Sequence, residues 1–127
     1  SGRAGSLVSS VPAFERYHQT GAQLWERQAL IKARAAVGDH RLIDQVNGLF
    51  EHFVYAEVID AAGVAEIQRL RGRMEHELAP ETAERFSIKT GRGGIVDVEF
   101  LVQMLQLRYG QRFAALRQRN TLAARTP

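Results

Sequence analysis

Residues 95–109, IVDVEFLVQMLQLRY, form a strongly apolar stretch near the end of the chain. On a helix, their apolar side chains cover most of the circumference and leave only a narrow polar stripe of Glu99, Gln103 and Gln106. Helices that are apolar nearly all round are typically buried. The stretch therefore predicts a central helix over residues 95–109, which Gly110 ends.

Four further helices are predicted upstream, because apolar residues recur there at intervals of three and four. Ser10 can cap the first helix, and Pro12 falls in its first turn, where proline is tolerated. Gly38 suits a left-handed end of the second helix, and Asp39 can cap the third. The first helix is expected to end at about Thr20, and the others to span about residues 22–37, 40–55 and 61–78.

No sustained strand pattern appears in the sequence. Five to six helices with short connections therefore predict an all-α bundle with a loop-like N-terminal segment. Residues 1–10 contain two glycines and four serines and are expected to be a loop, whereas residues 11–127 are expected to form the bundle domain. A short alternation at residues 86–89 indicates extended backbone, and the tail from residue 111 is expected to be partly helical.

The composition, 45% hydrophobic and 24% charged over 127 residues, is typical of one soluble globular domain. The absence of cysteine excludes disulfides, thiolate nucleophiles and cysteine-ligated metals, and it suits a cytoplasmic protein. No apolar run approaches the roughly 20 residues needed to span a bilayer. The net charge is only +3, so neither a membrane nor a nucleic acid is expected as a partner.

The glycine-rich run over residues 89–94 leads directly into the last helix and is a candidate phosphate site. Backbone N–H groups and the positive end of the helix dipole suit a phosphate, and Lys89 and Arg92 would add charge to the loop at Gly93 and Gly94. The spacing matches neither the Walker A motif nor the dinucleotide fingerprint. A tight turn that packs under the helix is the alternative.

The acidic residues Asp97 and Glu99 are two apart and point about 200° from one another on a helix. They therefore cannot chelate one metal ion side by side. A carboxylate on an otherwise apolar helix needs a partner, and a structural ion pair with Arg or Lys is the favoured interpretation for both.

The predicted second helix carries both an apolar face and a set of cations. Its apolar face would hold Trp25 together with Ala29, Ala33 and Ala36. Arg27 and Arg34 share another face, and Lys32 can run its stem along the apolar side towards an anion. A solvated charged face is the alternative.

The four histidines fall on different segments, and none has the i, i+4 spacing of a helical zinc site. The chain also lacks a Gly-x-Ser-x-Gly nucleophile elbow. We therefore expect no metal site and no catalytic residue in this chain.

Eight motifs, taken together, make the chain resemble glutamine synthetase adenylyltransferase over nearly its whole length. They are, in order, Ser1-Gly-Arg-Ala-Gly-Ser-Leu-Val-Ser-Ser10, Phe14-Glu-Arg-Tyr17, Trp25-Glu-Arg-Gln-Ala-Leu-Ile-Lys-Ala-Arg34 with Gly38-Asp39, Phe53-Val-Tyr55, Ile67-Gln-Arg-Leu-Arg71, Lys89-Thr-Gly-Arg-Gly-Gly-Ile-Val-Asp-Val-Glu-Phe-Leu-Val-Gln103, Leu107-Arg-Tyr-Gly110 and Asn120-Thr-Leu122. Such a set, found in order, is far more specific than any one motif.

The resemblance implies an enzyme that transfers AMP from ATP to a tyrosine of glutamine synthetase and removes it by phosphorolysis. Glutamine and the PII signal protein would control both reactions. Members of the family hold two nucleotidyltransferase units in tandem. In each unit, a helical bundle follows an α/β catalytic domain that carries a Gly-Ser motif and metal-binding aspartates. ATP and Mg²⁺ are therefore the cofactors that the resemblance implies for the parent enzyme.

By the resemblance, the chain is the bundle that follows a catalytic domain, and residues 1–10 are the remnant of that domain. The catalytic Gly-Ser motif and aspartates are absent from the sequence, and two-metal phosphoryl chemistry needs such carboxylates. We therefore expect the chain alone to be inactive and to bind neither ATP nor Mg²⁺. Its expected role is to complete the nucleotide cleft, hold the catalytic domain and relay regulation.

The resemblance also sorts the candidate site residues into two groups. The nucleotide-phosphate candidates are Lys32, Arg34, Lys89, Arg92, Gly93 and Gly94, and the structural ion-pair candidates are Glu26, Asp97 and Glu99.

Three alternatives stay open. The opening of the chain is similar to the adenylylating half of the family, whereas residues 53–55 and 67–71 are similar to the deadenylylating half. A regulatory module could bind glutamine synthetase or the PII protein without touching nucleotide. An unrelated helical nucleic-acid binder is the third possibility.

Overall fold

The computed structural model describes residues 8–78 and 91–120. Within these residues the chain forms only helices and connections, which confirms the predicted all-α class. The helices are α1 (Val11–Thr20), α2 (Leu24–Leu30), α3 (His40–Tyr55), α4 (Ala61–Leu78), α5 (Ile95–Tyr109) and one 3-10 turn, η1 (Ala114–Leu116). Apart from α2, each α-helix has the bounds that the sequence predicts.

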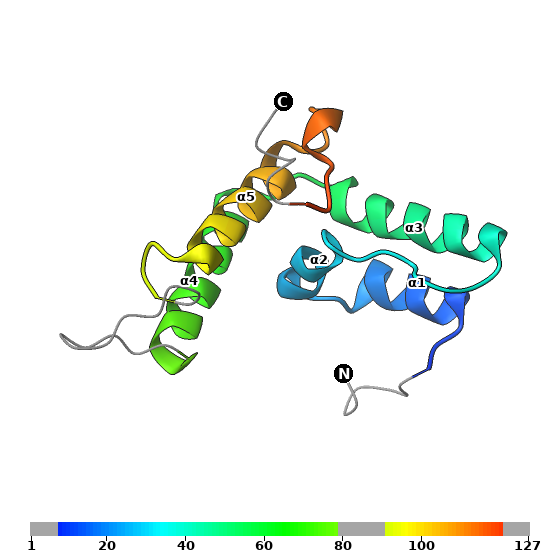
Figure 1. Cartoon of the computed structure of the whole chain (residues 1–127), viewed down its shortest axis with the longest axis horizontal. Helices are drawn as coiled ribbons and strands as arrows, with labels where there is room; N and C mark the ends of the chain where they lie inside the picture. The colour runs from blue at the N-terminus through cyan, green and yellow to red at the C-terminus, as the bar shows by residue number, and fades with distance from the viewer. Residues whose placement is uncertain (1–7, 79–90, 121–127) are drawn as a thin grey trace.

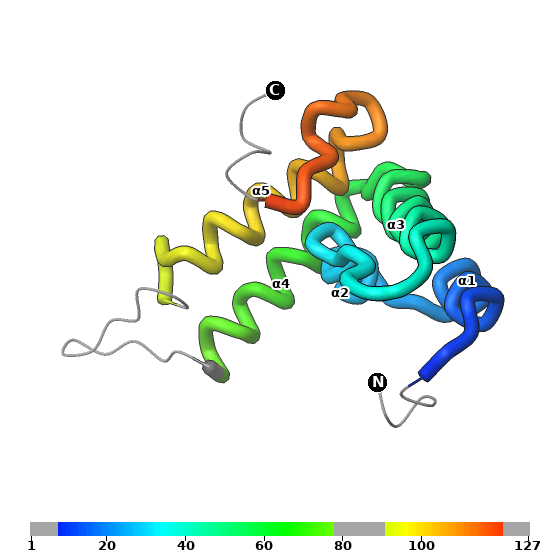
Figure 2. The backbone as a smooth tube through the Cα atoms, turned by 45° about the vertical axis from the view of Figure 1, so that its right-hand side comes forward, coloured from blue at the N-terminus to red at the C-terminus, as the bar shows by residue number. Residues whose placement is uncertain are grey.

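The helices form two pairs that meet at α2. Figure 1 shows α1 beside α3 and α4 beside α5, and the second pair runs antiparallel. The short α2 lies between the pairs in both views and contacts α3, α4 and α5 (Figure 2). The central helix of the fold is therefore α2. The prediction that the helix over residues 95–109 is central is wrong for this chain.

The core lies where these helices converge, and its buried members come from α3 to α5 and from the turns beside α2 and α3. They are Ile31, Val54, Tyr55, Ile59, Ile67 and Leu107. The ring of Tyr55 packs directly on the backbone of Gly110, where a Cβ atom would lie 2.4 Å from the ring carbon Cε1. Glycine at this position therefore permits the close approach of α3 and the end of α5.

Local caps explain why most helices begin where the sequence predicts. The Ser10 hydroxyl accepts a hydrogen bond from the Ala13 N–H at 3.3 Å, and Asp39 Oδ1 accepts one from the Arg41 N–H at 2.9 Å. Both predicted caps are thus confirmed. Asp60, which the sequence analysis did not single out, caps α4 in the same way through the Gly63 N–H at 2.8 Å.

The second helix ends at Leu30 instead of about residue 37. Beyond it, the Ala35 N–H donates to Asn47 Oδ1 of α3 at 2.8 Å, and Arg119 Nε donates to the Ala33 carbonyl at 2.9 Å. These tertiary hydrogen bonds replace the helical ones and draw the segment out along α3.

The early end of α2 corrects two further predictions. Gly38 has a positive φ of 145°, but it lies in the bend before Asp39 and ends no helix. The predicted apolar face is not buried, because Trp25 is half exposed and Ala29 and Ala36 are exposed. Lys32 and Arg34 lie on the connecting segment and not on a helix.

The tail after α5 folds back on the helix through the buried side chain of Gln106. Its amide nitrogen donates to the carbonyls of Leu116 and Gln118 at 2.8 and 2.7 Å. Part of the polar stripe of α5 therefore faces inward, where its amides find partners. The predictions for residues 1–7, 86–89 and 121–127 lie outside the described residues. None of the helices described is long and apolar enough to cross a bilayer.

Candidate functional site

The glycine-rich loop is fastened to α4 and α5 by one buried guanidinium and one carboxylate. Arg71, whose side chain is 9% exposed, donates from Nε to Asp97 Oδ1 at 2.5 Å and from Nη2 to the Gly91 carbonyl at 3.1 Å. The Gly93 N–H donates to Asp97 Oδ2 at 2.5 Å. The two oxygens of Asp97 thus join α4 to the loop at the start of α5.

In this arrangement, two backbone N–H groups that were predicted to bind a phosphate already donate hydrogen bonds within the protein. The Gly93 N–H bonds to Asp97, and the Gly94 N–H donates to the Gly91 carbonyl at 3.0 Å. Asp97 therefore acts as an internal anion at the start of α5, where negative charge is favoured. Arg92 is exposed, and its Nε lies 3.7 Å from Glu75 of α4. Lys89 lies outside the described residues.

The electrostatics of Asp97 give a pH prediction. The Gly93 N–H and, less strongly, the Arg71 guanidinium lower the pKa of the Asp97 carboxyl below its ordinary value of 3.8. The stabilisation of the fold by the ionised Asp97 carboxylate is therefore fully present above pH 3.8, and it is lost as the pH falls through the lowered pKa. The difference in unfolding free energy between the wild type and Asp97→Asn should shrink between neutral pH and about pH 3.

Urea unfolding at the two pH values measures that difference. Asp44→Asn, the same substitution at an exposed position of α3, is measured beside it as the control for removing one carboxylate. An Asp97→Asn difference that stays constant down to about pH 3 would contradict the proposed ionisation.

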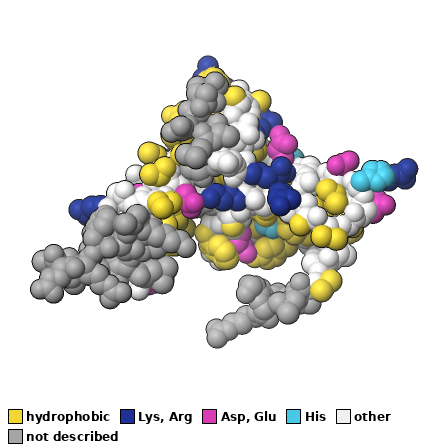
Figure 3. Space-filling model, viewed as in Figure 1, with side chains coloured by type: hydrophobic (Ala, Val, Ile, Leu, Met, Phe, Trp, Pro, Cys, Tyr) yellow, Lys and Arg dark blue, Asp and Glu magenta, His cyan; other side chains and the backbone are white. Residues whose placement is uncertain are grey.

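A second, basic cluster lies on the other side of α5. Lys32 Nζ is 2.9 Å from Glu99 Oε1, and both side chains are partly exposed. Together with Arg34, Arg119 and Asn120 they line a shallow depression of about 490 Å³. Figure 3 shows Lys and Arg side chains gathered in the middle of this view of the molecule. Three cations and one carboxylate leave the depression with a net charge of +2.

The phosphate candidates that the structure describes are therefore divided by α5: Arg92, Gly93 and Gly94 lie in the loop bound by Asp97, whereas Lys32 and Arg34 line the depression with Glu99. Asp97 bonds to α4, whereas Glu99 bonds to the segment after α2, in keeping with their angular separation on the helix. Arg119, which sequence reasoning missed, is 86 residues from the carbonyl of Ala33 to which it donates. No local pattern indicates such a contact.

The ion-pair candidate Glu26 has a different partner from the one expected. Its Oε1 accepts from the Tyr17 hydroxyl at 2.5 Å, and its Oε2 accepts from the Gln23 N–H at 2.7 Å. Among the described residues it forms no ion pair with Arg or Lys, so this carboxylate joins α1 to α2 through hydrogen bonds.

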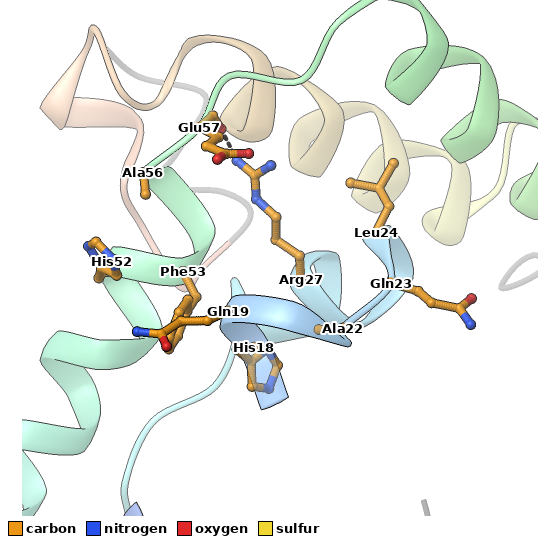
Figure 4. A pocket seen from close by; sticks show the side chains of 10 residues that line it. All are labelled: His18, Gln19, Ala22, Gln23, Leu24, Arg27, His52, Phe53, Ala56 and Glu57. Carbon is orange, nitrogen blue, oxygen red and sulfur yellow. Dashed lines mark hydrogen bonds between the residues drawn. The ribbon is translucent and has the colours of Figure 1, made fainter. Parts of the chain in front are cut away.

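A pocket of about 460 Å³ with mixed polar and apolar walls opens between α1, α2 and the end of α3. Figure 4 shows Arg27 extending from α2 towards the end of α3 and the segment beyond it. The guanidinium donates to the carbonyls of Val54 and Glu57, which makes Arg27 a structural residue and not part of a solvated face. His18 and His52 also line the pocket, but the described part of the chain contains no group of three or more His, Cys, Asp or Glu that could hold a metal ion.

Two protein families match successive parts of the chain. Residues 1–48 match the family model of glutamate-ammonia ligase adenylyltransferase, and residues 61–126 match that of GlnD PII-uridylyltransferase. The second match includes Arg71, Asp97 and Glu99, and the first includes Lys32 and Arg34.

Individual relatives match almost the whole chain and carry one name, "bifunctional glutamine synthetase adenylyltransferase/adenylyl-removing enzyme". The protein from Mycolicibacterium smegmatis is 38% identical over 125 residues, which are 97% of this chain and 12% of the relative. The protein from Mycobacterium leprae is 42% identical over 123 residues, and that from Pseudomonas aeruginosa is 36% identical over 121. This chain spans only 12% of the length of either.

Proposed function

Because the chain belongs to the glutamine synthetase adenylyltransferase family, we propose that it is the helical part of an enzyme that modifies glutamine synthetase. That enzyme would transfer AMP from ATP to a tyrosine of glutamine synthetase and remove it by phosphorolysis. Support comes from relatives whose names state both the adenylyltransferase and the adenylyl-removing activity. Glutamine synthetase, the PII signal protein and the preceding nucleotidyltransferase domain would be its partners.

Within that enzyme, the helical part would complete the nucleotide cleft through its basic depression. The observation that carries this proposal is the net charge of +2 around Lys32, Arg34 and Arg119. Glu99 pairs with Lys32, whereas Arg34 makes no ion pair with any described residue. A guanidinium donates two parallel hydrogen bonds to phosphate oxygens, so Arg34 is the residue best placed to bind a phosphate group.

The catalytic domain outside these residues would hold Mg²⁺. The best candidate carboxylates of α5 are already engaged, because Asp97 bonds to Arg71 and Glu99 bonds to Lys32. They also face different sides of the helix and cannot form one two-metal site. We therefore expect no transfer of label from α-labelled ATP to glutamine synthetase by this chain alone. Adding the catalytic domain should restore it, and transfer by the chain alone would contradict the accessory role.

Replacing Arg34 in the full-length enzyme tests the phosphate contact directly. Arg34→Gln should raise the KM for ATP by at least about tenfold, because a charge-assisted hydrogen bond contributes about 1.5–3 kcal/mol. If the contact is present in both the ground state and the transition state, its loss leaves kcat nearly unchanged. Arg73→Gln is the matched control, since Arg73 is exposed on α4 and lies 3.4 Å from Glu77. Equal KM values for the two variants would exclude Arg34 from the phosphate site.

The alternative function is a regulatory module that binds glutamine synthetase or the PII protein without touching nucleotide. It is favoured by the glycine-rich loop, whose Gly93 and Gly94 donors are already engaged inside the protein. In that case Arg34→Gln would leave the KM for ATP unchanged, and control of the reaction by the PII protein would depend on the helical part.

A further inference from the structure

One face of α5 is apolar and open to solvent along the whole helix. This face, here called the α5 stripe, consists of Ile95, Val98, Leu101, Leu105 and Tyr109. Their exposed fractions are 55, 51, 54, 39 and 45%. At 3.6 residues per turn these side chains fall within a sector of about 120°. None of the five is charged.

The α5 stripe faces away from the core. Leu107 is buried in the core, and Phe100 and Met104 pack against it, so they mark the opposite side of the helix. Leu101 also lines an apolar groove of about 290 Å³ between α4 and α5. The open apolar surface therefore continues from the stripe into a groove that can receive a side chain. Exposed apolar surface of this kind marks a docking site.

The size of the stripe argues against a second copy of the chain as its occupant. A helix is about 10 Å across and rises about 1.5 Å per residue, so the stripe measures roughly 20 by 10 Å. A stable interface between separate chains buries about 800 Å² of accessible surface and involves about 20–30 residues on each partner, whereas the stripe has five residues. A segment of the same polypeptide packs at high effective concentration and does not need that area.

We propose that the α5 stripe is the docking site of an apolar helix from the same polypeptide, outside these 127 residues. This inference rests on the proposed function, because it takes the chain to be part of a longer adenylyltransferase. The relatives leave ample polypeptide for such a helix, since this chain aligns with only 12% of the Mycolicibacterium smegmatis protein. The helix would make α5 central, the position for which its sequence is suited.

Thiol labelling of the full-length protein at one introduced cysteine tests the proposal, and residues 1–127 contain no other cysteine. Leu101→Cys is labelled in the native and the urea-denatured protein, and the ratio of rates is read from the peptide that contains residue 101. A covered stripe should slow native labelling by at least about tenfold. Arg69→Cys, at an exposed position of α4 whose side chain pairs with nearby Glu66, is the control and should be slowed far less.

The outcomes separate the possible occupants. Slow labelling of Leu101→Cys that is independent of protein concentration supports a helix of the same polypeptide. Slow labelling that is lost on dilution indicates a second copy and overturns the proposal, as does labelling as fast as that of Arg69→Cys. AMP transfer measured on the same variant keeps the hypotheses apart, because protection without transfer contradicts only the proposed function. Transfer without protection contradicts only the docking site.

Discussion

Arg71→Met is expected to lower the free energy of unfolding by about 2–3 kcal/mol. The guanidinium is almost fully buried and donates to Asp97 and to the Gly91 carbonyl. Methionine occupies a similar volume but donates no hydrogen bond, so Asp97 Oδ1 and the Gly91 carbonyl each lose one donor, whereas their bonds from the Gly93 and Gly94 N–H groups to Asp97 Oδ2 and Gly91 remain. The loss should be smaller than for a fully buried pair, because Asp97 is partly exposed and water can solvate it.

Arg69→Met on the same helix is the matched control. Arg69 pairs with Glu66 at 2.7 Å, but both side chains are exposed, and such pairs contribute less than about 1 kcal/mol. Urea unfolding of the two variants, followed by circular dichroism, measures the difference. Similar losses in both would show that burial does not strengthen the Arg71 contacts and that the loop is not held by them.

Gly110→Ala is expected to lower the free energy of unfolding by about 2 kcal/mol, through overlap of atoms. The new methyl group would lie 2.4 Å from both Tyr55 Cε1 and the Gln106 carbonyl oxygen. The backbone of Gly110 is right-handed helical, with φ −65° and ψ −24°, so alanine adopts it without strain. The cost therefore comes from overlap with the Tyr55 ring of α3 and with the Gln106 carbonyl of α5.

Gly48→Ala separates this effect from the helix propensity of alanine. Gly48 lies within α3, and a Cβ atom there meets nothing within 4 Å. Alanine at this position should raise the free energy of unfolding by up to about 1 kcal/mol. Thermal unfolding of the two variants should therefore give shifts of opposite sign. Shifts of the same sign would contradict the close approach of Tyr55 to Gly110.

The residues expected to affect stability differ from those expected to affect function. Arg71 and Asp97 secure the loop against α4, whereas Arg34 and the α5 stripe remain open on the surface. Changes to the first pair should act mainly on stability. Changes to Arg34 and Leu101 should act on ATP binding and on docking, which makes the predicted effects distinguishable.

The helices themselves could be predicted from the sequence because their signals are local. Apolar residues at helical spacing and the side-chain caps Ser10 and Asp39 act within one or two turns of backbone. The bounds of α3, α4 and α5 therefore agree with prediction, and so does the divergence of Asp97 and Glu99 around α5. The family resemblance likewise rests on motifs that are read directly from the residues.

The candidate site was predicted less completely, because its contacts join distant residues. The partner of Asp97 lies 26 residues away on α4, and the partner of Glu99 lies 67 residues away. The need of each carboxylate for a cation could be inferred from its place on an apolar helix, but the choice of Arg71 and Lys32 could not. Arg119 enters the basic depression only because the tail folds back over α5.

The sequence by itself determined the helical class, the positions of four helices and the family, since each depends on local spacing or on a motif. Only the tertiary structure decided where α2 ends, because Asn47 and Arg119 supply hydrogen bonds that outweigh its helical propensity. It also decided which face of α5 is buried. The sequence of a helix that is apolar nearly all round does not determine which face is buried, so the neighbouring helices decide it.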